Sequence, residues 1–487
     1  MTASTFQRLN IKSALKLFFS FSLGVWIQAV INVISIPIIT YLISPAEFGK
    51  ANMYSTIYSL LLTLILSGND QAFTRFFHEI EEDKRNDLLW SSLYFPFQIL
   101  VLITLILLFF NARVSTIVTG EAEHPMGILL TLSLLTGLLQ VFNLTAIRMQ
   151  KKGFLYSLVF VAQALFNVIT TILYAITFGR SFYAVIWGQI VSNTLSFLLG
   201  FVFEHSNILP VRINKELLKK ILAYSLPLLP SALLWWFQTW TSRIFLRAYS
   251  TFSELGLFSA AFRISYIMHL IYSGFQNFWI PVAFETYEKD RENTKLFVQT
   301  AEIITFSMAI FALLVIALKD VIFLVLAKEY RPASNILPLL LMSPVILAIL
   351  AVTNKGINFM KKTYWFIISD GVTLLVNIGL NFIFTRELGA RGAALSSALS
   401  FLVLFSIETF ASMKLFPVKY PLGKLFLTLF ILLACFLVNT FITIKSTAII
   451  TSLLGMLLIC ILNFDLLNKG VKETLRKLEG FLQKKNI

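Results

Sequence analysis

The chain has 487 residues, of which 57% are hydrophobic and 13% charged, whereas a soluble domain is about 45–50% apolar and about 25% charged. This balance excludes a water-soluble globular protein, since too few polar side chains are present to cover several soluble domains. The net charge of +15 comes from short basic clusters between apolar runs. Basic residues arranged in this way do not form the continuous basic face of a nucleic-acid-binding protein. They indicate instead a signal that sets the orientation of the chain in a membrane.

Apolar runs bounded by charged or turn residues follow one another along the whole chain. Each run of about 20 residues is long enough to cross the hydrocarbon core as a helix. The runs predict about fourteen spanning helices, at residues 14–43, 50–77, 88–110, 126–147, 154–178, 182–203, 218–246, 253–283, 298–325, 333–357, 363–385, 391–413, 421–443 and 447–466. The first run is too long for a cleaved signal peptide. The predicted fold class is therefore an all-α polytopic membrane protein.

The connections between the runs predict the orientation of the chain. An even number of helices places both termini on one side of the membrane. Connections on that side are basic, as in "RMQKKGF", "VRINKELLKK" and "MKKTYW", whereas those on the other side carry few Lys or Arg residues. Because basic residues gather on the cytoplasmic side, we expect both termini in the cytoplasm.

A sequence repeat divides the chain into two halves. The segment "AEFGKANMYSTIYSLLLTLILSG", from Ala46 to Gly68, recurs about 206 residues later as "SELGLFSAAFRISYIMHLIYSG", from Ser253 to Gly274. Six helices per repeat insert the same way up, which predicts two pseudo-symmetric lobes around a central cavity, plus two C-terminal helices. The predicted divisions are a first lobe at 1–203, a cytoplasmic linker at 204–217, a second lobe at 218–415, two helices at 416–466 and an amphipathic cytoplasmic tail at 467–487.

No segment carries catalytic equipment. The sequence has no Gly-rich nucleotide-binding loop, and its four His and two Cys residues lack the spacing of a metal or redox site. We therefore expect neither an enzyme nor a protein with a metal ion or a cofactor.

Ionisable residues inside the apolar runs are functional candidates, because each costs at least about 2.5–3.5 kcal/mol at mid-bilayer unless it faces water or a partner. The excess of cations suggests an anionic substrate, with snorkelling to lipid headgroups as the alternative for those near helix ends. The cationic candidates for substrate binding are Arg75, Arg148, Arg243, Arg263 and Lys355. The acidic candidates for ion coupling are Asp70, Asp370 and Glu408.

Neutral polar pairs spaced by four residues form a second pattern, since such pairs project from one helix face. The pairs Gln28 with Asn32 and Gln163 with Asn167 are candidates for binding sugar hydroxyls, and Gln189 with Asn193 repeats the pattern. Hydrogen bonds between helices are the alternative interpretation. Trp235, Trp236 and Trp240 could stack on sugar rings or face lipid.

Three segments resemble a known family. They are "YLISPAEFGKANMYSTI" from Tyr41, "SGNDQAFTRFF" from Ser67, and "LKKILAYSLPLLPSALLWWFQTWTSRIFLRAYSTFSELGLFSAAFRIS" from Leu218. They are similar to the polysaccharide biosynthesis proteins, that is, lipid-linked oligosaccharide (O-antigen) flippases of the multidrug, oligosaccharidyl-lipid and polysaccharide exporter superfamily. One departure is Ser242 before Arg243, where members often carry an acidic residue.

The resemblance implies alternating-access movement of an undecaprenyl-pyrophosphate-linked oligosaccharide across a bacterial inner membrane, for O-antigen, lipopolysaccharide or another surface polysaccharide. The partners so implied are the lipid-linked substrate, membrane lipids, H⁺ or Na⁺ as coupling ion and the polysaccharide polymerase machinery, with no nucleic acid. Two alternatives remain open. One is an ion-coupled multidrug or small-molecule exporter of the same superfamily, and the other is a membrane-embedded polysaccharide polymerase or ligase.

Overall fold

The computed structural model describes residues 11–204, 213–292, 294–442, 444–466 and 468. The chain forms two compact units, one of Met1–Arg247 with Thr251–Gly256 and one of Ala248–Ser250 with Leu257–Ile487. The predicted amphipathic tail and most of the predicted linker lie outside the described residues.

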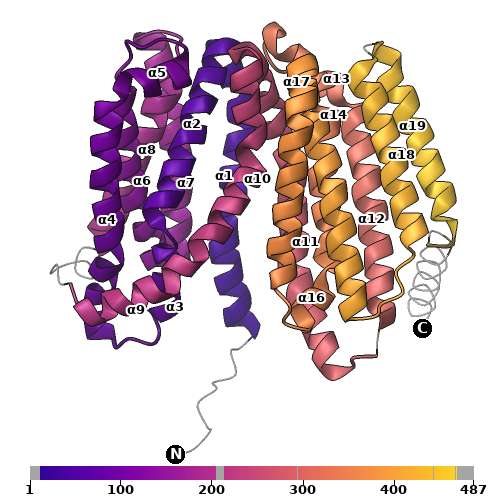
Figure 1. The fold of residues 1–487 in the computed structure, drawn as a ribbon, viewed down its shortest axis with the longest axis horizontal. Coiled ribbons are helices and arrows are strands. Elements are labelled where there is room, and N and C mark those ends of the chain that lie inside the picture. The colour runs from indigo at the N-terminus through magenta and orange to yellow at the C-terminus, as the bar shows by residue number, and fades with distance from the viewer. Residues whose placement is uncertain (1–10, 205–212, 293, 443, 467, 469–487) are drawn as a thin grey trace, which may run out of the picture. The chain divides into compact units, whose positions relative to one another are not determined.

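Every element of the described residues is helical, as Figure 1 shows. In the first unit the long helices are α1 (Ile11–Leu42), α2 (Pro45–Leu66), α4 (Arg85–Phe109), α6 (Met126–Met149), α7 (Gly153–Thr177), α8 (Tyr183–Glu204) and α10 (Leu229–Tyr249). Short helices connect them, namely α3 (Asn69–Phe76), η1 (Glu82–Lys84), α5 (Asn111–Thr119), α9 (Lys215–Ser225) and η3 (Leu226–Leu228).

The second unit continues from α11 (Phe252–Lys289), whose first turn belongs to the first unit. Its other long helices are α12 (Thr294–Ala317), α15 (Met342–Thr353), α17 (Tyr364–Leu415), α18 (Leu422–Phe441) and α19 (Lys445–Leu462). The short ones are α13 (Lys319–Leu324), η4 (Lys328–Asn335), α14 (Leu337–Leu340) and α16 (Lys355–Phe359). The packing units thus assign α9 and α10 to the first unit, whereas the sequence repeat assigns them to the second lobe, and the lobe boundaries stay a prediction.

The all-helical polytopic fold is confirmed, but the count of fourteen spans is not. Ten helices of the described residues are long and apolar enough to cross a membrane, or eleven if η4 with Leu337–Thr353, bent by 56°, is one span. Two predicted spans, 363–385 and 391–413, form the single element α17. α2 is absent from the ten, and its sequence carries polar residues along most of its length.

Two backbone breaks have a local cause. α2 ends at Ser67 and Gly68, which both adopt left-handed conformations with φ of 44° and 76°, so the predicted helix at 50–77 becomes α2 and α3. A Cβ at Gly68 would lie 2.9 Å from the Ser225 carbonyl oxygen, so a side chain there meets both strain and a clash. Within α17 the non-helical residue is Gly389, between the two predicted helices.

The starts of the two sequence repeats pack against each other reciprocally. A Cβ added at Gly49 would lie 1.9 Å from the Phe252 carbonyl oxygen, and one at Gly256 would lie 1.9 Å from the Pro45 carbonyl oxygen. Gly49 and Gly256 occupy the same place in the two copies, as do Pro45 and Phe252. Equivalent residues of the two copies therefore make both contacts. The glycines let the two backbones approach closely.

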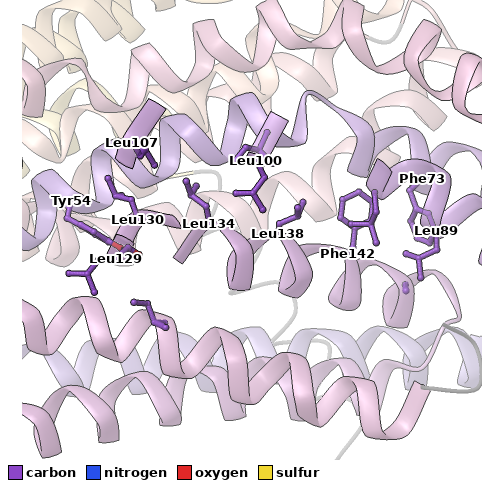
Figure 2. Close-up of a cluster of buried hydrophobic side chains, with 14 of the residues drawn as sticks. Tyr54, Phe73, Leu89, Leu100, Leu107, Leu129, Leu130, Leu134, Leu138 and Phe142 are labelled. Atoms are coloured by element: carbon purple, nitrogen blue, oxygen red, sulfur yellow. The ribbon is translucent and has the colours of Figure 1, made fainter. Parts of the chain in front are cut away.

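The core of the first unit lies between α2, α3, α4 and α6. Leucines recur along one face of α6 and pack against leucines of α4, as Figure 2 shows. Tyr54 of α2 is fully buried, and its hydroxyl donates to the Leu129 carbonyl oxygen at 2.8 Å. The same hydroxyl lies 2.6 Å from the Ser133 Oγ. In lipid, tight packing and such interhelical hydrogen bonds hold helices together.

Candidate functional site

The first unit holds an open cavity of 510 Å³ between α2, α3 and α10. A pocket of this size lies within the range of about 300–1,000 Å³ that is typical of a site for one drug-sized ligand. Its wall combines aromatic rings with neutral hydroxyl and amide groups, and none of the described residues that line it is charged. The lining residues are Ser59, Thr63, Gln71, Leu228, Ser231, Ala232, Trp235, Trp236, Thr239 and Trp240.

The tryptophans are held in place by packing and one hydrogen bond. Trp236 is 4% exposed, and its Nε1 donates to the Ser59 Oγ at 2.8 Å. Its ring is nearly parallel to that of Trp240, with centroids 6.5 Å apart and an interplanar angle of 16°. Trp235 is 58% exposed. The cavity therefore presents two stacked rings, Trp236 and Trp240, and the exposed ring of Trp235 beside hydroxyl groups, an arrangement that suits the apolar faces and hydroxyls of a sugar.

Arg243 lies one turn beyond the cavity on α10. It is 4% exposed, and its guanidinium carbon lies 4.4 Å from the centre of the Trp240 ring. Its Nη1 donates to the Thr239 carbonyl oxygen at 3.2 Å. The cation thereby fixes one face of the Trp240 ring and places positive charge next to the aromatic wall.

The other charged candidates of the first unit lie elsewhere. Arg75 Nη1 lies 2.5 Å from Glu79 Oε1, and Lys220 of α9 donates to Glu79 Oε2 at 3.2 Å. The Lys220 hydrogen bond, aided by the charge of Arg75, lowers the pKa of the Glu79 carboxyl. Asp70 in the first turn of α3 is close enough to Arg148, in the last turn of α6, for their charges to interact.

The neutral pairs divide between two environments. Gln163 of α7 donates through Nε2 to the Asn193 Oδ1 of α8 at 2.8 Å. Tyr58 of α2 is hydrogen-bonded to the same Asn193, so three helices share this contact. The contact is a hydrogen bond between helices, which is the alternative to sugar binding that the sequence analysis gives for these pairs. Gln28 of α1 is half-buried and four residues from the exposed Asn32, and Asn167 is half-buried on α7. A role of these residues in substrate binding stays a prediction.

The second unit contains a buried cluster of ionisable groups where α16 approaches α17. Glu408 is 5% exposed, and its Oε2 accepts from Asn354 Nδ2 at 2.9 Å. Its Oε1 accepts from the Ser369 Oγ at 3.1 Å. The charges of Lys355, which is 6% exposed, and of Asp370 also act on Glu408. Three of the predicted site residues therefore converge here.

Arg263 does not join this cluster. It lies in α11, and its charge interacts with the hydroxyl group of Tyr330 in η4. Among the described residues, no group of three or more His, Cys, Asp or Glu side chains is placed to hold a metal ion.

Several site residues escaped the sequence analysis. Ser55, Ser59 and Thr63 recur every fourth residue along α2, so their hydroxyls lie on one helix face, and Ser59 and Thr63 line the cavity. That spacing is a readable signal. Asn354 and Ser369 directly precede Lys355 and Asp370 in the sequence, and only the fold brings them to Glu408.

Solved structures share this fold. The inward closed conformation of the lipid II flippase MurJ matches with a TM-score of 0.69 and 15% identity, covering 92% of this chain and 99% of that one. An inward-facing multidrug resistance MATE family transporter of the MOP superfamily matches with a TM-score of 0.62 and 16% identity, covering 80% and 95%. A Vibrio cholerae MATE transporter, VcmN, matches with a TM-score of 0.54 and 14% identity, covering 83% and 98%.

The sequence comparisons address the family. No curated protein matches the chain. The profile of the family described as "Polysaccharide biosynthesis protein" matches residues 14–287, which is more than half of the chain and includes α2, α3 and α10. The chain therefore belongs to the polysaccharide biosynthesis protein family.

Proposed function

We propose that this protein is a flippase. It moves an undecaprenyl-pyrophosphate-linked oligosaccharide repeat unit from the inner to the outer leaflet of a bacterial inner membrane, for O-antigen, lipopolysaccharide or another surface polysaccharide. Family membership and the fold shared with a lipid II flippase support this proposal. The proposed role is that of a transporter rather than an enzyme.

The observation that carries the proposal is the aromatic and hydroxyl-lined cavity between α2 and α10. A hydrated oligosaccharide cannot enter about 30 Å of hydrocarbon without partners that replace its water. Ser59, Thr63 and Thr239 offer such partners, while Trp235 and Trp240 offer flat apolar surfaces. The prenyl tail would remain in lipid throughout.

The pyrophosphate requires cations, and the driving force requires a coupling group. In this proposal Arg243 and other predicted cations neutralise the pyrophosphate during transfer. H⁺ or Na⁺ would exchange at an acidic residue, for which the Glu408 and Asp370 pair in the second unit is the best-placed candidate. Consumption of the product by the polymerase machinery on the outer side is the other source of drive.

The decisive experiment uses a strain that lacks the protein. Surface polysaccharide should be lost, and lipid-linked repeat units should accumulate in the inner leaflet. Wild-type protein should restore both, and Trp235→Ala should restore them poorly. The control Phe109→Ala, on α4 and 82% exposed away from the cavity, should restore them fully. Normal surface polysaccharide in the deletion strain would contradict the proposal.

A multidrug or small-molecule exporter is the second candidate, because the MATE transporters share the fold. The cavity wall carries aromatic rings that would also suit a drug. The same deletion strain separates the two functions. Raised drug sensitivity with normal surface polysaccharide would favour the exporter.

The ion-coupling part of the proposal is tested in proteoliposomes. With an imposed H⁺ or Na⁺ gradient, Asp370→Asn should lose gradient-stimulated flipping and keep substrate binding. Wild-type flipping that is unchanged when all gradients are collapsed would leave the flippase proposal intact and remove the coupling role.

A further inference from the structure

The second unit holds a cavity of 410 Å³ that the proposed transport function does not use. It lies where α13 and η4 meet the C-terminal end of α18 and the start of α19. Three basic residues line it, namely Lys319, Lys328 and Arg331, together with one acidic residue, Asp320. The lining therefore carries an excess of positive charge.

Lys319 forms the buried base of this cavity. It is 3% exposed, and its Nζ donates to Asn335 Oδ1 at 3.1 Å and to the Asn439 carbonyl oxygen at 2.9 Å. An ammonium group has three N–H donors, so these two bonds, which are those it makes with the described residues, leave one for a ligand. The negative charge of Asp320 acts on Lys319, and Arg391 of α17 adds a smaller positive effect. With Lys328 and Arg331 beside them, the lining keeps a net positive charge, which favours an anion at the spare donor of Lys319.

The position of these cations departs from the charge pattern of the chain. The connection between residues 317 and 337 belongs to the side predicted to be outer, where connections otherwise carry few Lys or Arg residues. Three of them nevertheless surround this one cavity. The preference of basic residues for the cytoplasmic side therefore does not explain these three basic residues, whereas binding of an anionic ligand does.

The rim of the cavity is apolar and exposed. Leu324 and Ile444, which line it, are 56% and 64% exposed. Val321 and Val325 on the neighbouring α13 turn are 60% and 57% exposed. In a membrane protein such side chains face acyl chains. A soluble anion gains nothing from this rim, whereas a lipid matches both the cationic base and the apolar edge.

We propose that this cavity binds the phosphate headgroup of an anionic phospholipid at the predicted outer end of the second unit. Lys319, Lys328 and Arg331 contact the phosphate oxygens, and the acyl chains run along Leu324 and Ile444. The site is separate from the aromatic cavity of the first unit, so it stands whether or not the chain moves lipid-linked sugars.

Native mass spectrometry of the full-length, delipidated protein in detergent tests the proposal. The probes are phosphatidylglycerol, phosphatidylcholine and inorganic phosphate. The main variant combines Lys328→Gln with Arg331→Gln, which are both exposed and leave the buried Lys319 in place. The matched control combines Lys414→Gln with Lys419→Gln, two exposed lysines of the same unit at the predicted inner end.

Wild type and control should bind phosphatidylglycerol more tightly than phosphatidylcholine. Each basic residue near anionic lipid contributes about fivefold to affinity, so the double variant should bind about 25-fold more weakly. Lys319→Gln, which keeps a donor but removes the charge, should weaken binding as well. If it fails to fold, the surface double variant still decides the question.

Three results would overturn the proposal. The first is equal phosphatidylglycerol affinity in wild type and the Lys328 and Arg331 double variant. The second is equal affinity for phosphatidylcholine, which would show that net lipid charge plays no part. The third is full displacement of phosphatidylglycerol by an equal concentration of inorganic phosphate, which would assign the cavity to a soluble anion.

Discussion

The cavity between α2 and α10 in the first unit is open and lined by aromatic rings and neutral hydroxyls, whereas the cluster around Glu408 in the second unit is closed and built from ionisable groups. Trp235 is 58% exposed, and Glu408 is 5% exposed. A side chain on an open wall can change without disturbing the helices that carry it. A buried carboxylate cannot, because its partners are then left without a counterpart. The two regions should therefore fail in different ways when altered.

The largest effect is expected at Glu408. Glu408→Ala removes the acceptor of Asn354 and Ser369 and leaves the buried Lys355 without its counter-charge. Each buried donor left without its acceptor costs about 1–3 kcal/mol of unfolding free energy. Thermal denaturation in detergent should show a strongly lowered midpoint together with lost transport. An unchanged midpoint would mean that the cluster does not stabilise the unit.

A double-mutant cycle sharpens this prediction. Lys355→Met combined with Glu408→Gln removes both charges and keeps the volumes close to the originals. The double variant should recover part of the stability lost by Lys355→Met alone, because the uncompensated charge is gone. Strict additivity of the two changes would show that Lys355 and Glu408 do not interact.

The opposite behaviour is expected at the open cavity. Trp235→Ala should lower transport about tenfold, the loss of about 1.4 kcal/mol that one aromatic contact with a ligand can supply, while the denaturation midpoint stays unchanged. Trp236→Ala should lower both, because Trp236 is buried and bonded to Ser59. A Trp235→Ala variant that loses stability but transports normally would contradict the expectation that the open cavity serves transport and not folding.

The helices themselves were largely predictable, since a run of about 20 apolar residues in lipid has few solutions other than a spanning helix. The break between 363–385 and 391–413 was predicted, and Gly389 occupies it. The break at Ser67 and Gly68 was missed because the predicted helix at 50–77 continues across the polar segment from Ser67 to Gln71 into the residues beyond it. That run of Ser, Gly, Asn, Asp and Gln was the local signal of a turn.

The site was less predictable than the fold. Single ionisable residues in apolar runs were recognisable one by one, and Lys355, Asp370 and Glu408 were among them. Their convergence was not, because it depends on how α16 packs against α17, which no local pattern encodes. The sequence alone did not decide whether the tryptophans of α10 stack on sugar rings or face lipid. Only the packing of α10 on α2 places them on a cavity wall.

A smaller effect is expected at Arg243, at the edge of the open cavity. Arg243→Lys keeps the charge but loses the planar guanidinium that lies over the Trp240 ring. Such a contact is worth about 0.5–2 kcal/mol and Lys retains part of it, so we expect a fall in transport of about twofold to tenfold. Transport should be measured at matched protein levels. A complete loss would indicate that the pyrophosphate requires the guanidinium fork of Arg243, and not only its charge.

The smallest effect concerns the ion-pair link between α3 and α9, two helices next to the open cavity. The hydrogen bond from Lys220 and the charge of Arg75 lower the pKa of Glu79 relative to an unfolded Glu, which titrates near about 4.3. Glu79 pairing therefore stabilises the protein above that pH, and the stabilisation is lost as the pH falls through the lower folded pKa. The midpoint difference between wild type and Glu79→Gln should be slight at neutral pH, because the pair is exposed, and should vanish in acid. Hydrogen exchange along α3 and α9 measures the same link locally. A midpoint difference that is constant across this pH range would mean that the Glu79 side chain acts through packing, not charge.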